Sequence, residues 1–224
     1  MLASACPHCG AEVIFRSPTL PVKVCDYCRT LVMRAGDELR SMGTAAVLPF
    51  DVSPVQIGTR GTFMERAFEI VGRVRWGWVS GSWNEWLMLF EDGRHGWLAE
   101  AMGQFMVTLP WPLDKDTSPA IQSMADGRDA KLGDQVEIGN TVYQVVDIKS
   151  RARCIAAEGE LPFTAPAGWT ITNIDMRSDG GEFASFQRDR TQSDLYVGRY
   201  VSLPELRPRG LRTIEGWAQP SFAG

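Results

Sequence analysis

A glycine-led figure occurs twice in this chain and constrains its fold more than any other feature. Residues 57–76 read IGTRGTFMERAFEIVGRVRW, and residues 132–151 read LGDQVEIGNTVYQVVDIKSR. Gly58 and Gly133 lie 75 positions apart, and apolar positions follow at the same spacing: Phe63, Phe68, Ile70 and Val71 in the first copy, and Ile138, Tyr143, Val145 and Val146 in the second. Because turn residues flanked by β-prone apolar runs are typical of hairpins, the repeat predicts two related β units.

Short strand-like segments separated by turn residues fill both copies. Residues 83–90, WNEWLMLF, are strongly apolar, and the Asp92-Gly93 pair that follows favours the positive φ of a tight hairpin turn. The sequence therefore predicts a mainly β protein, in which an N-terminal zinc ribbon precedes two related small β-barrel-like units of the SH3-like or curved-sheet kind. The predicted boundaries are 1–34 for the ribbon, 50–109 and 132–203 for the units, 110–131 for a linker or a crossing strap, and 204–224 for an irregular tail.

Four of the five cysteines form two C-x2-C pairs. Cys6 and Cys9 make the first pair, and Cys25 and Cys28 make the second, fifteen residues further on. This spacing is typical of zinc sites, because two cysteines separated by two residues can direct their sulfurs to one point. We expect a structural Zn²⁺, since four thiolates leave no open coordination position for catalysis. Iron in a rubredoxin-like mode and a metal-free ribbon are the alternatives.

Charge and hydropathy exclude several classes of protein. The net charge of −4 lacks the basic footprint that phosphate contacts require, so nucleic acid is a disfavoured partner. No apolar run reaches the ~20 residues of a transmembrane helix, and the N-terminus lacks the basic and apolar regions of a signal peptide. We therefore expect a cytoplasmic protein that is not integral to a membrane, which leaves peripheral contact with a membrane complex open. Paired cysteines with one left over also suit a reducing compartment.

Several short motifs in fixed order make the body resemble a bacterial family of unknown function, the domain-of-unknown-function family 4178. The motifs are Ile57-Gly, Phe68-Glu-Ile-Val-Gly, Trp83-Asn-Glu-Trp, Gly96-Trp-Leu, Leu132-Gly-Asp, Tyr143-Gln-Val-Val, Gly159-Glu-Leu-Pro and Tyr196-Val-Gly. The resemblance covers most of residues 50–203. It implies a non-catalytic accessory protein, because members look like companions of membrane-stress-like gene clusters and aminopropyltransferase-like enzymes. It brings no active site with it.

The remaining candidate residues have ordinary structural interpretations. Cys154 lies near two arginines without a base, and His95 has no catalytic partner, so we expect a half-buried strand residue and a hairpin surface residue. Glu85, Glu91 and Glu100 fit a solvated strand face better than a carboxylate pair. The two copies diverge at Trp76-Gly-Trp78, where the second copy has Arg151-Ala-Arg153. We expect residues 76–82 to include an exposed loop, with Trp76 and Trp78 as candidate partner-binding residues.

Three functions are consistent with these observations. We expect a non-catalytic adaptor that binds an unidentified protein partner through its β modules and the aromatic loop, with no catalytic residues. The first alternative is a nucleic-acid-binding zinc-ribbon protein. The second, suggested by the companions of the resembling family, involves polyamine-like cations: the protein is either an accessory subunit that binds them for a partner enzyme or an enzyme that uses the cleft between the two β units.

Overall fold

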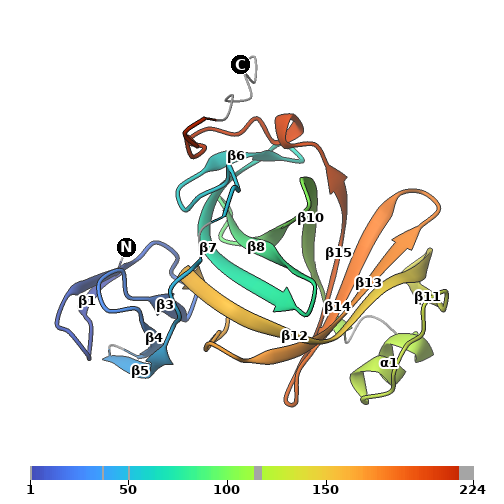
Figure 1. The fold of residues 1–224 in the computed structure, drawn as a ribbon, viewed down its shortest axis with the longest axis horizontal. Helices are drawn as coiled ribbons and strands as arrows, with labels where there is room; N and C mark the ends of the chain where they lie inside the picture. The colour runs from blue at the N-terminus through green and yellow to red at the C-terminus, as the bar shows by residue number, and fades with distance from the viewer. Residues whose placement is uncertain (1, 37, 50, 114–117, 217–224) are drawn as a thin grey trace.

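The computed structural model describes residues 2–36, 38–49, 51–113 and 118–216, and Figure 1 shows a small head beside a larger curved sheet. The prediction of a mainly β protein is confirmed. The head contains β1 (Leu2–Ala5), β2 (Glu12–Phe15), β3 (Val22–Val24), β4 (Thr30–Ala35) and β5 (Glu38–Thr44). β1 pairs with β2 alone, whereas β3, β4 and β5 extend the large sheet.

The first repeat unit supplies β6 (Arg60–Phe63), β7 (Arg66–Trp78), β8 (Gly81–Phe90), β9 (His95–Ala101) and β10 (Gln104–Trp111). The second unit supplies β11 (Gln135–Ile138), β12 (Thr141–Leu161), β13 (Thr170–Ser178), β14 (Glu182–Arg188) and β15 (Ser193–Val201). A short helix, α1 (Pro119–Ala125), precedes β11, and a 3-10 helix, η2 (Leu203–Leu206), follows β15.

Eight of these strands form one antiparallel ring. In the first unit β7, β8, β9 and β10 form a four-stranded meander, and in the second unit β12, β13, β14 and β15 form another. β10 pairs with β15 and so joins the two meanders at their last strands. The long strand β12 joins them again at their first strands, because it pairs with β13 up to Arg153 and with β7 from Arg153 to Gly159. Its end, Glu160 and Leu161, then pairs with β3 of the head. The two units therefore share one sheet and do not close as separate barrels. The shared sheet does not test the residue boundaries predicted for the two units, which stay predictions.

The hydrogen bonds confirm the internal repeat. Gly58 and Gly133 both have a φ of 90°, and their amides donate to Ile70 (2.8 Å) and Val145 (2.9 Å), again 75 positions apart. β11 lies 75 positions after β6, and the start of β12 lies 75 positions after the start of β7. From β8 and β13 onward the spacing is 88, as Met88 and Met176 illustrate, because β12 and the segment after it are longer than β7 and its turn.

Three clusters of buried apolar side chains stabilise this arrangement. One lies within the first unit and contains Phe68, Ile70 and Trp86. A second lies within the second unit, where α1 contributes Ile121 and Met124. The third joins both units to the head, through Trp76 and Trp97 of the ring and Leu31 of β4. Such contiguous burial of large side chains supplies most of the free energy of folding.

One local prediction is wrong, and the structure adds detail to two others. Residues 76–78 belong to β7 and residues 81–82 to β8, so the expected aromatic loop is only a tight turn at Val79 and Ser80. The segment 110–131, predicted as a linker or a crossing strap, contains α1, which packs against the second unit, and its residues 114–117 lie outside the described residues. The segment 204–224 is not irregular throughout, since η2 packs against the first unit and Arg209 bridges to Arg60; its residues 217–224 lie outside the described residues.

Candidate metal centre and ligand cavity

The four cysteines of the head meet at one point. The sulfurs of Cys6, Cys9, Cys25 and Cys28 all lie within 4.8 Å of one another, and the Cys6–Cys28 and Cys9–Cys25 sulfur distances are 3.7 and 3.8 Å. A regular tetrahedron of thiolates around Zn²⁺ at ~2.3 Å places its sulfurs about 3.8 Å apart. The sulfurs are too far apart for disulfides. The cluster could therefore hold a metal ion, and its geometry fits a tetrahedral one.

The two cysteine pairs have matching backbone geometry. The amides of Cys6 and Cys25 donate to Ala11 (2.8 Å) and Thr30 (2.9 Å), while Gly10 and Arg29 donate back to the two cysteine carbonyls at 2.9 Å. Gly10 and Arg29 both have positive φ, 76° and 61°. Glycine adopts such values readily, and a non-glycine residue does so at a cost. The Arg29 side chain donates to the carbonyl of Ala157 on β12 at 3.0 Å, so the strained turn also ties the head to the ring.

Glu160 fixes the other side of the head. Its carboxylate is buried and accepts the backbone amides of Arg16 (2.6 Å) and Ser17 (2.9 Å). Buried carboxylates need such donors, because an unpaired one costs several kcal/mol. The head is therefore held to the ring by charged hydrogen bonds and by the shared apolar cluster.

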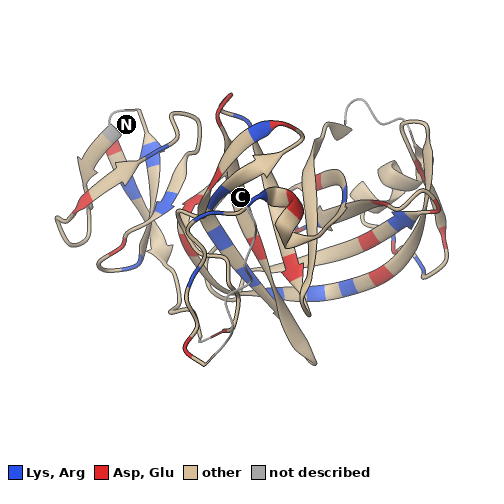
Figure 2. Cartoon of the chain, turned by 90° about the horizontal axis from the view of Figure 1, so that it is seen from above, with Lys and Arg blue, Asp and Glu red and all other residues tan. Residues whose placement is uncertain are grey.

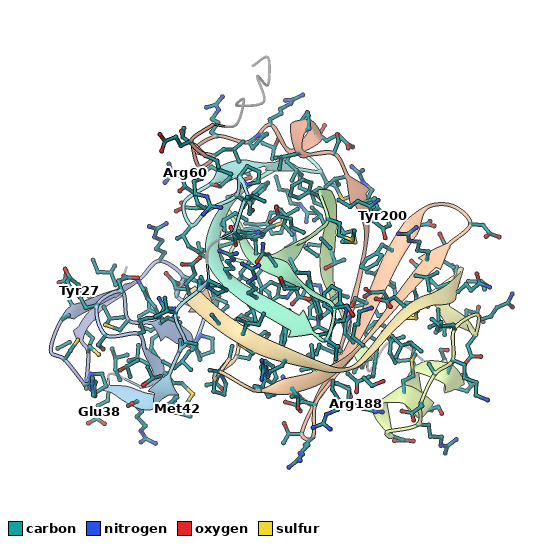
Figure 3. The ribbon with its side chains drawn as sticks, in the orientation of Figure 1. Tyr27, Glu38, Met42, Arg60, Arg188 and Tyr200 are labelled. Atoms are coloured by element: carbon teal, nitrogen blue, oxygen red, sulfur yellow. The ribbon has the colours of Figure 1, made fainter. Side chains whose placement is uncertain are left out.

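A cavity of about 260 Å³ lies inside the ring, and every one of the eight ring strands contributes to its wall. Figure 3 shows how densely side chains otherwise fill the space that the strands surround. The aromatic part of the wall contains Trp78, Trp83, Trp97, Phe183 and Tyr196. The polar part contains Glu85, Thr108, Asp147, Lys149, Asn173, Asp175, Ser185 and Gln187.

Glu85 is the buried carboxylate of the first unit. It accepts hydrogen bonds from Trp76 Nε1 (2.8 Å), Trp83 Nε1 (3.1 Å) and, across the cavity wall, Gln187 Nε2 of the second unit (2.7 Å). Burial raises the pKa of Glu85 to about 6, although these neutral donors lower it. The donors satisfy the oxygens without neutralising the charge.

Asp175 is a carboxylate that the second unit adds to the same cavity wall. Its Oδ1 accepts Asn173 Nδ2 (2.9 Å) and Ser185 Oγ (2.8 Å), and no described residue donates a hydrogen bond to Oδ2. Burial raises the pKa of Asp175 to about 6, with nearby Asp147 adding to the rise. Asp175 therefore presents an unused carboxylate oxygen to the cavity.

A third carboxylate, Asp147, already has a cation. Lys149 Nζ lies 2.5 Å from both Asp147 oxygens and 5.1 Å from the centroid of the Trp78 ring. Among the described residues that line the cavity, Lys149 is the single cationic side chain. With the carboxylates ionised, the wall therefore has three negative charges against one positive charge.

The structure relocates the residues predicted from sequence. Trp76 is fully buried and supports Glu85, while Trp78 faces the cavity, so the prediction of an exposed Trp76 is wrong. The assignment of Glu85 to a solvated face is also wrong, because both faces of β8 are covered. Glu100 bonds to Trp86 at 3.0 Å on the opposite face from Glu85, and Glu91 lies in a turn, so these glutamates do not converge.

Cys154 and His95 lie away from the cavity wall. Burial raises the pKa of the Cys154 thiol to about 12, which disfavours the reactive thiolate. Burial also lowers the pKa of His95, which is partly covered rather than fully on the surface. Neither Cys154 nor His95 is among the described residues that line the cavity.

The sequence reasoning missed Asp147, Lys149 and Asp175. One signal could have identified them: Asn173 and Asp175 alternate with Ile174 and Met176 on a strand whose other face is apolar. The same alternation places Asp147 and Lys149 on one face of β12. Without knowledge of the ring, however, this face is indistinguishable from a solvated one.

Positive and negative residues are mixed along the described strands (Figure 2). Figure 2 shows Lys and Arg interspersed with Asp and Glu along the strands of the sheet. Such a pattern disfavours a phosphate-binding surface. Within the described part of the chain, none of the helices has the length and apolar character that a membrane crossing requires.

Comparison with known proteins adds a family and no function. No curated protein and no solved structure matches the chain. One family model, described as a domain of unknown function (DUF4178), matches residues 56–203, which contain all eight ring strands together with β6, α1 and β11. The match covers more than half of the sequence and coincides with the repeat and the cavity. The chain therefore belongs to the DUF4178 family.

Proposed function

We propose that this protein is a non-catalytic binding protein whose ring cavity takes a small organic cation. The observation that carries the proposal is the excess of carboxylates over cations on a largely aromatic cavity wall. A buried carboxylate without a counter-charge is costly, and a bound cation removes part of that cost. Two of the three carboxylates, Glu85 and Asp175, have only neutral donors as partners.

The aromatic side chains favour an ammonium ligand with an apolar body. Indole and phenol rings attract cations through their faces, most strongly where water is excluded. Lys149 over Trp78 shows this interaction within the protein itself. A cavity of about 150 Å³ accommodates benzene, so one of 260 Å³ suits a ligand on the order of ten non-hydrogen atoms.

This proposal develops the cation-binding alternative that the sequence left open. The adaptor role, expected through the β modules and the aromatic loop, has less support at the loop, because Trp76 is buried and Trp78 faces the cavity. We assign binding and not catalysis, because the described lining residues include no cysteine or histidine, and the one hydroxyl that donates to a carboxylate there, Ser185 to Asp175 at 2.8 Å, also donates to Asn173 within the hydrogen-bond network of the wall. An accessory role beside a partner enzyme, in the cytoplasm, is consistent with this assignment.

We propose further that the cysteine cluster holds a structural Zn²⁺ that folds the head. The test is metal analysis of the purified protein, which should contain about one zinc per chain by the four-thiolate logic. Cys9→Ser should lose the metal, and Cys154→Ser should retain it as a matched control. Iron in place of zinc would change the metal assignment, and a metal-free wild-type protein would contradict it.

The cation proposal is tested with n-hexylamine and 1-hexanol, which share a shape and differ in charge. Tryptophan fluorescence should report binding of the amine, because Trp78, Trp83 and Trp97 line the cavity. Asp175→Asn should lower the affinity for the amine by about tenfold or more, as expected for a lost hydrogen bond to a charged group. Asp179→Asn, in the exposed β13–β14 turn, is the matched control. Equal binding of amine and alcohol would show that the cavity recognises no cation.

A further inference from the structure

Lys149 occupies the position that a second ligand ammonium would need. We propose that Lys149 acts as a resident cation that reserves Asp147 and so restricts the ring cavity to ligands with a single ammonium group. This inference rests on the proposed cation-binding function and adds to it a class of ligand and a residue that selects it.

Lys149 already makes the two kinds of contact that an ammonium group would make in this cavity, one with a carboxylate and one with an aromatic ring. Asp147 and Lys149 are two residues apart on β12, so their side chains leave the strand on the same face. Both Asp147 oxygens accept from Nζ at 2.5 Å, and the Trp78 ring lies 5.1 Å away. The side chain of Asp147 is 45% exposed and that of Lys149 is 22% exposed, which places the pair at the open side of the cavity.

Asp147 of β12 and Asp175 of β13 lie directly opposite each other on adjacent strands. The register pairs Asp147 with Asp175 and Lys149 with Asn173. Directly opposed residues of this kind have Cβ atoms about 5 Å apart. Without Lys149, the two carboxylates would form a site for two ammonium groups. With Lys149 in place, a second ammonium would have to displace or approach a like charge, and only the free oxygen of Asp175 remains for the ligand.

The first repeat unit has no such pair. The positions equivalent to Asp147 and Lys149 are Gly72 and Val74, which are both buried. Gly72 has no side chain and Val74 belongs to the apolar cluster that joins the head to the ring. The Asp147–Lys149 pair is therefore not part of the shared scaffold, which the first unit builds without it. A role specific to the cavity accounts for its position better than a general contribution to the fold.

The test compares n-hexylamine with 1,6-diaminohexane on the full chain. The wild-type protein should favour the monoamine. Lys149→Met should raise the affinity for the diamine relative to the monoamine by about tenfold, because a freed carboxylate gains an ammonium partner. Lys131→Met removes the same charge from an exposed position outside the cavity and should leave the ratio unchanged.

A double variant separates selection from simple loss of charge. Asp147→Asn combined with Lys149→Met removes both members of the pair and should restore the preference for the monoamine. Thermal melting of each variant verifies that it is folded. An unchanged ratio in Lys149→Met, while the monoamine still binds, would overturn this inference and leave the cation-binding function standing. Failure of n-hexylamine to bind the wild-type protein would instead overturn both.

Discussion

The two repeat units have the same backbone and different inner walls. Their opening turns match at Gly58 and Gly133, and even the strand irregularities recur, between Ile70 and Gly72 in the first unit and between Val145 and Asp147 in the second. Equivalent positions facing inward nevertheless differ in kind. Leu87 corresponds to Asp175, and Trp97 corresponds to Ser185.

This difference separates what the fold requires from what the cavity requires. Turns, irregularities and the outward apolar clusters are common to both units, so they specify the sheet. Some inward positions that are apolar in the first unit, such as Leu87 and Trp97, are polar in the second, where Asp175 and Ser185 stand, while Glu85 is the carboxylate that the first unit adds to the wall. A duplicated scaffold can vary these positions because they contact the cavity and not the shared turns.

The largest effect is expected at Gly72, whose counterpart is Asp147. A Cβ at Gly72 would overlap the backbone carbonyl of Glu160, because β7 and β12 approach closely where the ring closes. Gly72→Ala should therefore destabilise the protein by more than about 4 kcal/mol, or prevent folding. Asp147→Ala should cost about 1 kcal/mol or less, since it removes only a partly exposed ion pair.

Urea unfolding of the two alanine variants measures this contrast. Circular dichroism verifies that each variant starts from a folded state. Similar losses at Gly72 and Asp147 would show that the two units are not distinguished by ring closure at this position.

The next effect comes from exchanging an inward residue between units. Leu87→Asp places the aspartate of the second unit into the apolar wall of the first, where Leu87 is fully buried. Without donors equivalent to Asn173 and Ser185, the charge should cost about 3 kcal/mol or more at pH 7. The cost should shrink toward pH 5, because a buried carboxyl binds a proton more readily than an unfolded one. Leu87→Asn, which cannot ionise, is the control and should show no such pH dependence.

The sequence predicted the parts of this protein that depend on local patterns. Gly58 and Gly133 identified the repeat because a positive-φ turn needs glycine, and the cysteine spacing identified the cluster of four cysteines that could hold a metal ion. The ring was not predictable, because β10 pairs with β15 and β7 pairs with β12 across long stretches of chain that no local period encodes. Glu85 was misplaced for the same reason: alternation divides β8 into two faces without showing that both are covered.

A smaller effect is expected at the two opening turns. Gly58 and Gly133 have equal φ, and a Cβ at either position would meet no atom within 4 Å. Alanine should therefore cost about 1–2 kcal/mol at each through backbone strain alone. The two losses should agree within about 0.5 kcal/mol. Denaturation midpoints of the two variants test the equivalence, and a marked difference would show that the turns differ in context despite their matching hydrogen bonds.

The smallest effect is expected at Asp175, the residue of the second unit that corresponds to Leu87, and it concerns how the free energy of unfolding depends on pH. The pKa of Asp175 is raised to about 6 by burial, and an unfolded aspartate titrates near 4. The folded protein therefore binds more protons than the unfolded chain between about pH 4 and pH 6. The contribution of Asp175 to the free energy of unfolding therefore falls as pH rises through that window and stays low above it. The groups acting on Asp175 are Asp147, which raises the pKa further, and Lys149, Asn173 and Ser185, which lower it.

Asp175→Asn removes this cost without changing shape, since the amide oxygen can still accept from Asn173 and Ser185. The variant should be more stable than the wild type by about 1 kcal/mol at pH 7.5, allowing for partial solvent access, and equal to it near pH 4. Chemical denaturation at both pH values measures the difference. A variant less stable than the wild type at pH 7.5 would mean that Asp175 serves the fold. A more stable variant that no longer binds n-hexylamine would show that the second unit retains a destabilising carboxylate for its ligand.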